Sequence, residues 1–288
     1  MSSFSPDWLA LREPADHAAR DPGLVAALGR VLAARDGPVR VVDLGCGTGS
    51  NLRALAPHLG PAQAWCLVDH DPALLAAARA RLAAWAERAE ETESGLALSA
   101  GGARLHVRFR ALDLAADPAA AAAEGPDLVT AAALFDLASE AWITAVARAV
   151  AETGAAFYTA LTYDGHETWT PPHPADAAIH TAFLAHQAGD KGFGPAAGPG
   201  ATEALAKAFR VHDYIVATAP SPWRLGSAEI ALLDQLAEGT VRAALETGRV
   251  AAADSAAWMA ARRLPGTRAV IGHQDLLALP SSGTRRIA

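Results

Sequence analysis

Three glycines at alternate positions mark the most informative stretch of the chain. Residues 43–49 read Asp-Leu-Gly-Cys-Gly-Thr-Gly and follow a buried apolar run over 39–44. Such glycines let a turn pass tightly from a strand into a helix and let a ligand approach bare backbone. A pyrophosphate-binding loop spaces its glycines G-x-G-x-x-G, whereas this loop reads G-x-G-x-G after an acid. The spacing favours a cofactor without phosphates, whose amino-acid end carries an ammonium that Asp43 can pair with.

Two further acidic residues follow the ends of later strands. Asp69 ends a short apolar strand about 20 residues after the loop, where a carboxylate can accept hydrogen bonds from both ribose hydroxyls. Asp113 follows a strand over 105–112, where its oxygen can meet an adenine amino group. Ligands of open α/β sheets bind at these strand ends, so the acids are expected to converge on one crevice. Taken singly, Asp43 could instead brace the loop and Asp69 could cap a turn.

The elements that position these residues alternate along the chain. Apolar runs predict five strands separated by helices, which indicates parallel βαβ units and a doubly wound sheet. The alternation of apolar and polar residues over 105–112 predicts a half-exposed strand at a sheet edge. After Tyr163 the pattern breaks into a polar stretch, and two more strands follow. The seven predicted strands are 39–44, 64–68, 105–112, 128–134, 156–161, 212–217 and 268–279.

The sequence VVDLGCGTGSN around the glycine loop resembles motif I of the class I S-adenosylmethionine-dependent methyltransferases. Asp69 in LVDHDP and Asp113 in ALDLA resemble the next two cofactor motifs of that family. The resemblance covers roughly residues 38 to 162. It implies a Rossmann-like, doubly wound α/β sheet of seven strands, mostly parallel with an antiparallel last strand, and S-adenosylmethionine as cofactor.

The resemblance also implies roles for individual residues. The loop glycines would pack on the methionine and ribose portions of the cofactor, and Asp69 would hold the ribose. Asp113 with Leu112 would flank the adenine, and the segment 132–136 would lie next to the donor methyl. The expected cofactor-binding residues are Asp43, Gly45, Gly47, Gly49, Asn51, Asp69, Leu112, Asp113 and Ala133.

We expect one methyltransferase domain over residues 1–288, with helical and loop insertions that form a lid. Its parts are an N-terminal helical lid (1–37), a cofactor-binding core (38–162), a substrate-side insertion (163–210) and C-terminal strands with inserted helices (211–288). The insertion is rich in histidine, and polar loops positioned by a rigid sheet are where substrate residues concentrate.

Candidate acceptor-side residues come mainly from this insertion. His166, His186 or Asp164 could serve as general base, since an O- or N-acceptor often needs one. The alternative is a hydrogen-bonded lid without a chemical role, and a thiolate acceptor would require no base. Arg224 could hold an anionic acceptor or be an ordinary surface arginine. The candidate substrate-binding residues are Tyr163, Trp169, Lys191 and Arg224.

No metal site is expected. His180 and His186 are six residues apart, about 240° around a helix, and no H-E-x-x-H or paired cysteine pattern is present. The only cysteines are Cys46 and Cys66, too few for a disulfide framework.

Composition narrows the class of acceptor. The net charge is −7 and no segment is a run of Lys and Arg, which argues against a nucleic-acid partner. No apolar stretch has the length of a membrane span, so a cytoplasmic location is expected. The fourth strand ends in Ala-Ala-Leu-Phe-Asp-Leu rather than Asn-Pro-Pro-Tyr, which disfavours nucleobase or glutamine amide acceptors.

The sequence therefore predicts S-adenosylmethionine-dependent methyl transfer to a small molecule, at an undetermined O, N or S atom. Four alternatives stay open: a protein or RNA methyltransferase, a non-methylating enzyme that uses the same cofactor, a non-catalytic binding protein, and a nicotinamide-dependent dehydrogenase. The last lacks its expected G-x-G-x-x-G loop.

Overall fold

The computed structural model describes residues 4–35 and 37–281. Residues 1–3 and 36 of the predicted N-terminal lid and residues 282–288 of the predicted C-terminal part lie outside the described residues. Its strands form one mixed sheet in the order β3-β4-β5-β2-β1-β6-β7-β10-β8, with β9 paired to β10. The strands are β1 (Val39–Leu44), β2 (Ala62–Asp69), β3 (Arg88–Thr92), β4 (Gly95–Ala100), β5 (Ala103–Ala111), β6 (Leu128–Ala132), β7 (Ala156–Thr170), β8 (Tyr214–Pro220), β9 (Trp223–Leu225) and β10 (Arg268–Pro280).

Nine α-helices are found in the described part of the chain. They are α1 (Pro6–Ala19), α2 (Pro22–Ala33), α3 (Ser50–Leu55), α4 (Pro72–Trp85), α5 (Glu140–Thr153), α6 (Asp176–Gln187), α7 (Ala201–Arg210), α8 (Ile230–Glu246) and α9 (Ala252–Arg262). A short 3-10 turn, η3 (Phe135–Leu137), follows β6. None of the described helices is both long and apolar enough to cross a membrane.

The central strands β5, β2, β1, β6 and β7 run parallel, and β10 is antiparallel to both β7 and β8. The mostly parallel, Rossmann-like sheet with an antiparallel last strand is thus confirmed. The predicted number of strands is wrong, because the sheet has ten rather than seven. The additions are the hairpin β3–β4 at one edge and the short β9.

The alternating pattern of β5 predicted a strand at the edge of the sheet. This prediction is wrong, because β4 pairs with β5 on that side. Its alternation has another origin: Arg104, His106 and Arg108 are exposed on one face while Leu105 and Val107 are buried on the other. The hairpin was not predicted, because every residue of β3 is exposed and the strand has no run of apolar residues.

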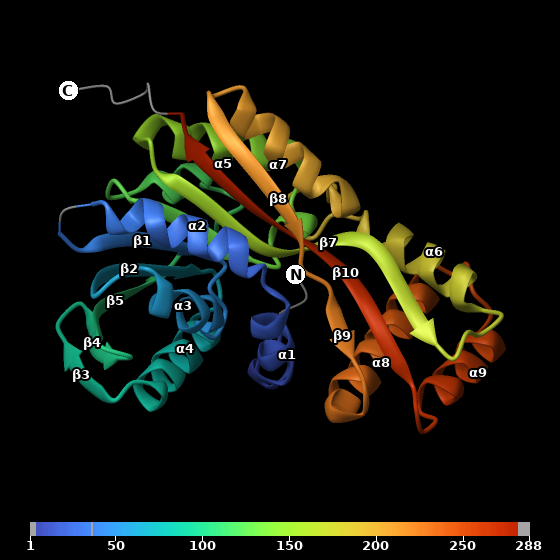
Figure 1. Ribbon diagram of the computed structural model, residues 1–288. Coiled ribbons are helices and arrows are strands. Elements are labelled where there is room, and N and C mark those ends of the chain that lie inside the picture. Colours follow the sequence, from blue (N-terminus) through green and yellow to red (C-terminus); the bar gives the residue numbers. More distant parts are fainter. Residues whose placement is uncertain (1–3, 36, 282–288) are drawn as a thin grey trace.

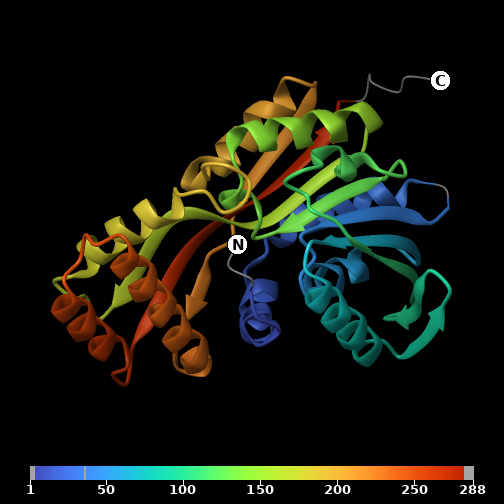
Figure 2. The ribbon, with the colours of Figure 1, turned by 180° about the vertical axis from the view of Figure 1, so that it is seen from behind.

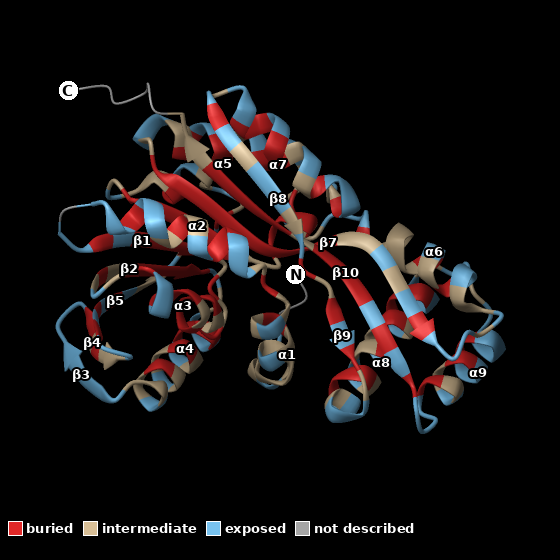
Figure 3. Cartoon of the chain, in the orientation of Figure 1, coloured by how far each residue is buried: buried red, intermediate tan, exposed pale blue. Residues whose placement is uncertain are grey.

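Helices cover both faces of the sheet and form three layers (Figure 1). On one face, apolar side chains of α2, α3 and α4 pack against β1 and β2. On the other face α5 and α7 pack against alternate residues of the same strands and of β6 (Figure 2). The central strands are accordingly buried along most of their length (Figure 3). This rigid sheet fixes the positions of the strand ends where ligands of such folds bind.

β7 and β10 continue far beyond the central sheet. We predicted that β7 ends at Leu161, but it runs on to Thr170, where Thr170 pairs with Arg268. Leu161 has a φ of +61°, close to the register shifts in this ladder. Around the extension lie α6, α8, α9 and β9, to the right of α1 in Figure 1. We call this part, residues 162–187 and 223–274, the lobe.

Candidate functional site

The glycine loop connects β1 to α3 and is held by the neighbouring strand. Gly45 and Gly47 have φ values of +63° and +53°, which residues other than glycine rarely adopt. The backbone N–H of Cys46 donates to the carbonyl of Val68 at 3.0 Å, and that of Gly47 donates to Asp69 Oδ2 at 2.9 Å. The loop and the end of β2 therefore form one unit.

Asp43 and Asn51 lie beneath this loop, fully enclosed. Asn51 Nδ2 donates to Asp43 Oδ1 at 2.7 Å and lies 3.1 Å from Thr130 Oγ1 on β6. Burial raises the pKa of Asp43 to about 7, although the hydrogen bond from Asn51 lowers it. Among the described residues, Asp43 Oδ2 and Asn51 Oδ1 have no hydrogen-bond partner. Two buried acceptors without a donor are costly unless a ligand supplies one.

The carboxyl ends of β2 and β5 bring three of the predicted residues next to one another: Asp69, Leu112 and Asp113. The carboxylate of Asp69 is buried and also accepts a hydrogen bond from the backbone N–H of Asp71 at 3.0 Å. The backbone N–H of Leu112 donates to the Asp69 carbonyl at 2.9 Å. Asp113 is exposed, and its Oδ1 accepts from the N–H of Ala115.

The segment after β6 faces the loop from the other side. Ala133 has a φ of +51°, and its N–H donates to Ala160 on β7 at 3.0 Å. The next side chain, Leu134, packs against the loop: a Cβ added at Gly45 would lie 3.4 Å from Leu134 Cδ1. The structure thus brings all nine predicted cofactor-binding residues to one end of the central strands.

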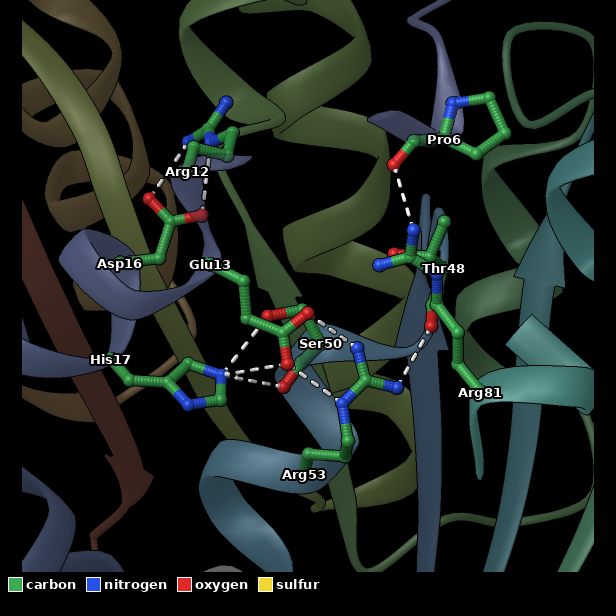
Figure 4. Close-up of polar contacts among 9 residues, drawn as sticks. All are labelled: Pro6, Arg12, Glu13, Asp16, His17, Thr48, Ser50, Arg53 and Arg81. Carbon is green, nitrogen blue, oxygen red and sulfur yellow. Dashed lines mark hydrogen bonds and ion pairs between the residues drawn. The ribbon is translucent and has the colours of Figure 1, made fainter. Parts of the chain in front are cut away.

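Helix α1 closes over the loop (Figure 4). Glu13 pairs with Arg53 on α3 at 2.6 Å, and Arg53 also donates to the carbonyl of Thr48 inside the loop. His17 Nε2 lies 3.0 Å from the Ser50 hydroxyl oxygen. Leu9 approaches the loop so closely that a Cβ at Gly47 would lie 3.0 Å from its Cδ1. The N-terminal helix expected as a lid therefore lies directly on the loop.

Arg20, at the end of α1, reaches the same buried region. Its charge lowers the pKa of Asp43 and also acts on the Tyr158 hydroxyl, which donates to Asp275 Oδ2 at 3.0 Å. Arg20 Nε and one terminal nitrogen nevertheless lack partners. Unpaired acceptors on Asp43 and Asn51 fit an ammonium, and unpaired donors on Arg20 fit a carboxylate. These residues fit the amino-acid end of S-adenosylmethionine.

Asp136 and Gln187 form a second buried pair, beside the segment after β6. Asp136 lies in η3, is 7% exposed, and accepts a hydrogen bond from Gln187 Nε2 at 3.1 Å. Burial raises its pKa to about 6, opposed by backbone N–H groups including that of Tyr163 and by the charge of Arg12. Asp136 Oδ1 and Gln187 Oε1 have no partners.

Arg12 and aromatic rings line the neighbouring region between α1 and the lobe. Arg12 makes two hydrogen bonds to Asp16 and stacks over Trp223, whose Nε1 donates to Asp16 Oδ1 at 3.0 Å. The ring of His273 lies 5.1 Å from that of Trp223. Burial, assisted by the charge of Arg12, lowers the pKa of His273 to about 3, so this imidazole is neutral.

The predicted acid–base residues lie farther out. The His166 side chain is 88% exposed, and its Nδ1 lies 3.2 Å from Asp164 Oδ1. His186 Nε2 pairs with the exposed Glu246 of α8 at 2.9 Å. Lys191 Nζ donates to the backbone carbonyl of His186 at 2.9 Å. The two histidines are not brought together, and their catalytic roles stay predictions.

The predicted substrate-binding residues are also spread over the molecule. The Tyr163 hydroxyl lies 3.3 Å from His180 Nε2, while the backbone N–H of Tyr163 is directed at the Asp136 carboxyl. Trp169 packs at the far end of the lobe against Trp258, with ring centroids 5.2 Å apart. Arg224 is exposed on β9. The charge of Arg12 on α1 reaches Asp136, whereas the role of Arg224 in substrate binding stays a prediction.

Sequence reasoning assigned no role to Arg12, Arg20, Asp136, Gln187 or His273. Only Asp136 had a signal, since it belongs to the segment expected beside the donor methyl. The others converge from α1, α6 and β10 and have no motif in common. Among residues 4–35 and 37–281, no three His, Cys, Asp or Glu side chains gather in an arrangement that could hold a metal ion.

Solved structures resemble this chain in fold at low identity. A cyclopropane-fatty-acyl-phospholipid synthase-like protein from Lactobacillus casei ATCC 334 is 14% identical, with a TM-score of 0.50 over 96% of this chain and 94% of the other. A methyltransferase from Geobacter sulfurreducens, solved with S-adenosyl-L-homocysteine, is 14% identical, with a TM-score of 0.48 over 96% and 99%. One from Thiobacillus denitrificans, solved with the same compound, is 16% identical, with a TM-score of 0.46 over 96% and 99%.

The family comparison is more specific than these likenesses of fold. No curated protein matches the chain. Residues 42–166 match a family model described as a methyltransferase domain. This range contains the glycine loop, Asp69, Asp113 and the segment after β6. Residues 42–166 therefore form a methyltransferase domain, which makes the chain an enzyme with S-adenosylmethionine as its cofactor.

Proposed function

We propose that this enzyme methylates a small-molecule acceptor. The observation that carries the proposal is the enclosure of the polar groups next to the expected methyl position. Asp136 is 7% exposed, and the loop that faces it lies under α1. The overall charge of −7 adds support, because a nucleic-acid acceptor favours a basic surface.

The cofactor side of the proposal uses residues that are close together. Asp43 and Asn51 would receive the ammonium of the methionine end, and Arg20 its carboxylate. Asp69 would accept hydrogen bonds from the ribose, while Leu112 and Asp113 would flank the adenine. When bound, the cofactor supplies an electrophilic methyl group on a sulfonium. Gly45, Gly47 and Ala133 offer backbone without bulky side chains around that group.

On the acceptor side, the enzyme's contribution would be alignment and exclusion of water. Transfer requires the acceptor atom, the methyl carbon and the sulfur to lie in one line, and holding them there lowers the barrier. Helix α1 and the lobe would exclude water from this line. The acceptor would enter from the side of Arg12, Tyr163 and His273, where aromatic and polar groups alternate.

Transfer of labelled methyl groups tests this function. The purified protein is incubated with methyl-labelled S-adenosylmethionine and a cell extract, which is then separated into small-molecule and macromolecular fractions. Label in the small-molecule fraction is expected. Label on protein or RNA would contradict a small acceptor. Consumption of the cofactor without methylated product would identify a non-methylating enzyme.

A further inference from the structure

Asp136 and Gln187 present two buried oxygen atoms that lack hydrogen donors. Gln187 is 6% exposed, and its Nε2 is already committed to Asp136 Oδ2 at 3.1 Å. That bond fixes the orientation of the amide and leaves Gln187 Oε1 as an acceptor. Asp136 Oδ1 is the other oxygen without a partner. An unsatisfied buried acceptor destabilises the folded protein, so this pair suits a ligand that brings donors.

The neighbouring side chains do not supply those donors. The charge of Arg12 acts on Asp136, but both its Nε and a terminal nitrogen bind Asp16. Its guanidinium also lies over Trp223, with 4.9 Å between the central carbon and the ring centroid. The Tyr163 hydroxyl contacts His180 instead. Although the backbone N–H of Tyr163 lies near the Asp136 carboxyl, Asp136 Oδ1 and Gln187 Oε1 have no hydrogen-bond partner among the described residues, so both can accept from an external ligand.

The position of the pair relates it to the reacting centre. Asp136 follows Leu134 by two residues, and Leu134 packs on the glycine loop. Gln187 is the last residue of α6, so the lobe delivers it to the end of β6. A group bound between these oxygens would lie on the side of the loop opposite Asp69, where the proposed function requires the acceptor.

The donor count distinguishes between classes of acceptor. A hydroxyl or thiol has one hydrogen and could satisfy only one of the two oxygens, while its own lone pairs would face the other. An amine has enough N–H groups for both, and in its ammonium form a positive charge that suits an ionised Asp136. Asp164 and Glu167 add negative charge near Tyr163.

We infer that the methyl acceptor is a primary or secondary amine, held by Asp136 and Gln187; the inference rests on the proposed small-molecule methyl transfer. A proton leaves the ammonium nitrogen for Asp136 Oδ1, while a remaining N–H donates to Gln187 Oε1. The nitrogen lone pair forms the new N–C bond, and the C–S bond breaks with its electrons staying on sulfur. The products are the N-methylated ammonium, S-adenosylhomocysteine and a protonated Asp136.

Isotope-labelled cofactor tests the inference directly. The protein is incubated with trideuteromethyl S-adenosylmethionine and a small-molecule extract of the organism that encodes it. Products are found by their mass shift, and fragment ions identify the atom that carries the label. A label on an amine nitrogen is expected. A labelled ether, ester or thioether overturns the amine inference while small-molecule methyl transfer stands. Failure to methylate any small molecule contradicts the proposed function itself.

Three variants separate chemistry from structure. Asp136→Asn keeps the size of the side chain and is expected to lower kcat by at least about 100-fold, as for loss of a general base. Gln187→Leu is expected mainly to raise KM for the amine. Both should retain S-adenosylhomocysteine affinity, measured by calorimetry, which also reports an intact fold. Asp234→Asn, an exposed change on α8, serves as control. Wild-type kcat in Asp136→Asn overturns the assignment.

Discussion

Asp43 is fully buried under the glycine loop, and burial raises its pKa to about 7. An aspartate in an unfolded chain titrates near 3.9. The folded protein therefore keeps a proton on Asp43 at intermediate pH that the unfolded chain has released. In that window the folded state binds more protons than the unfolded state, so this group makes stability fall as the pH rises.

Asp43→Asn isolates this effect, because the amide keeps an oxygen for Asn51 but cannot ionise. Between about pH 5 and about pH 8 the wild type should lose stability relative to the variant, on the order of 2–4 kcal/mol. Urea unfolding of the cofactor-free protein at several pH values measures this difference. Other shifted groups, such as Asp136, are present in both proteins and cancel. Parallel pH curves would show that Asp43 is not the group responsible.

The residues of the cofactor side were predictable because they lie close in sequence to strand ends. Asp43, Asn51 and the loop glycines belong to one short segment, and Asp69 follows the next strand. Arg12, Gln187 and His273 could not be predicted in this way. They come from three separate elements, and only tertiary packing brings them toward Asp136.

At the scale of elements, α1 is held on the glycine loop by the Glu13–Arg53 ion pair, the His17–Ser50 contact and the packing of Leu9. The pair of Glu13 and Arg53 is the most enclosed ion pair between α1 and α3, with side chains 18% and 7% exposed. Since α1 covers Gly47 through Leu9, a ligand in the loop region requires this helix to move or to form around it. We therefore expect the Glu13–Arg53 pair to influence the access of ligands to the loop.

Glu13→Gln should loosen α1 without unfolding the sheet. The variant removes the negative charge and leaves Arg53 with a weaker partner, a loss of about 1–3 kcal/mol. Amides of α1 should exchange hydrogen faster, and S-adenosylhomocysteine should dissociate roughly 5- to 100-fold faster in stopped-flow experiments. Asp7→Asn, an exposed change on the same helix, is the matched control. Equal dissociation rates in the two variants would mean that α1 does not gate the site.

Elements with a buried face were predictable from their apolar period, and elements without one were not. The seven predicted strands are present. β3 was missed because its residues are all exposed, and the polar second half of β7 looked like a loop. Pairing with β10, a partner about 100 residues away, makes this half a strand.

At the scale of the whole molecule, Arg262 joins three parts of the lobe. This arginine is 3% exposed on α9. Its terminal nitrogens donate to the carbonyl of Pro171 beyond β7 and to Asp176 on α6, both at 2.7 Å. It also lies over the rings of Trp169 and Trp258. Because α6 ends in Gln187, the position of the acceptor pair depends on this distant anchor.

Arg262→Ala should therefore destabilise the protein and impair turnover, although the residue lies far from the loop. Removing Arg262 leaves the Asp176 carboxylate without its cationic partner. Because the Asp176 side chain is 30% exposed and water can solvate part of its charge, we expect a loss of roughly 2–4 kcal/mol in the free energy of unfolding. The neighbouring Arg263→Ala is the matched control: Arg263 makes only exposed ion pairs, with Asp234 and Glu238, and its loss should change little.

Below the melting temperature of Arg262→Ala, the cofactor and acceptor sides should separate. S-adenosylhomocysteine affinity should stay near that of the wild type, because Asp43, Asp69 and the glycine loop belong to the central sheet. Acceptor KM should rise, because the lobe carries Gln187. Calorimetry and steady-state kinetics on the same preparation measure both. Equal losses on the two sides would mean that the lobe and the sheet act as one unit, and that Arg262 serves overall stability alone.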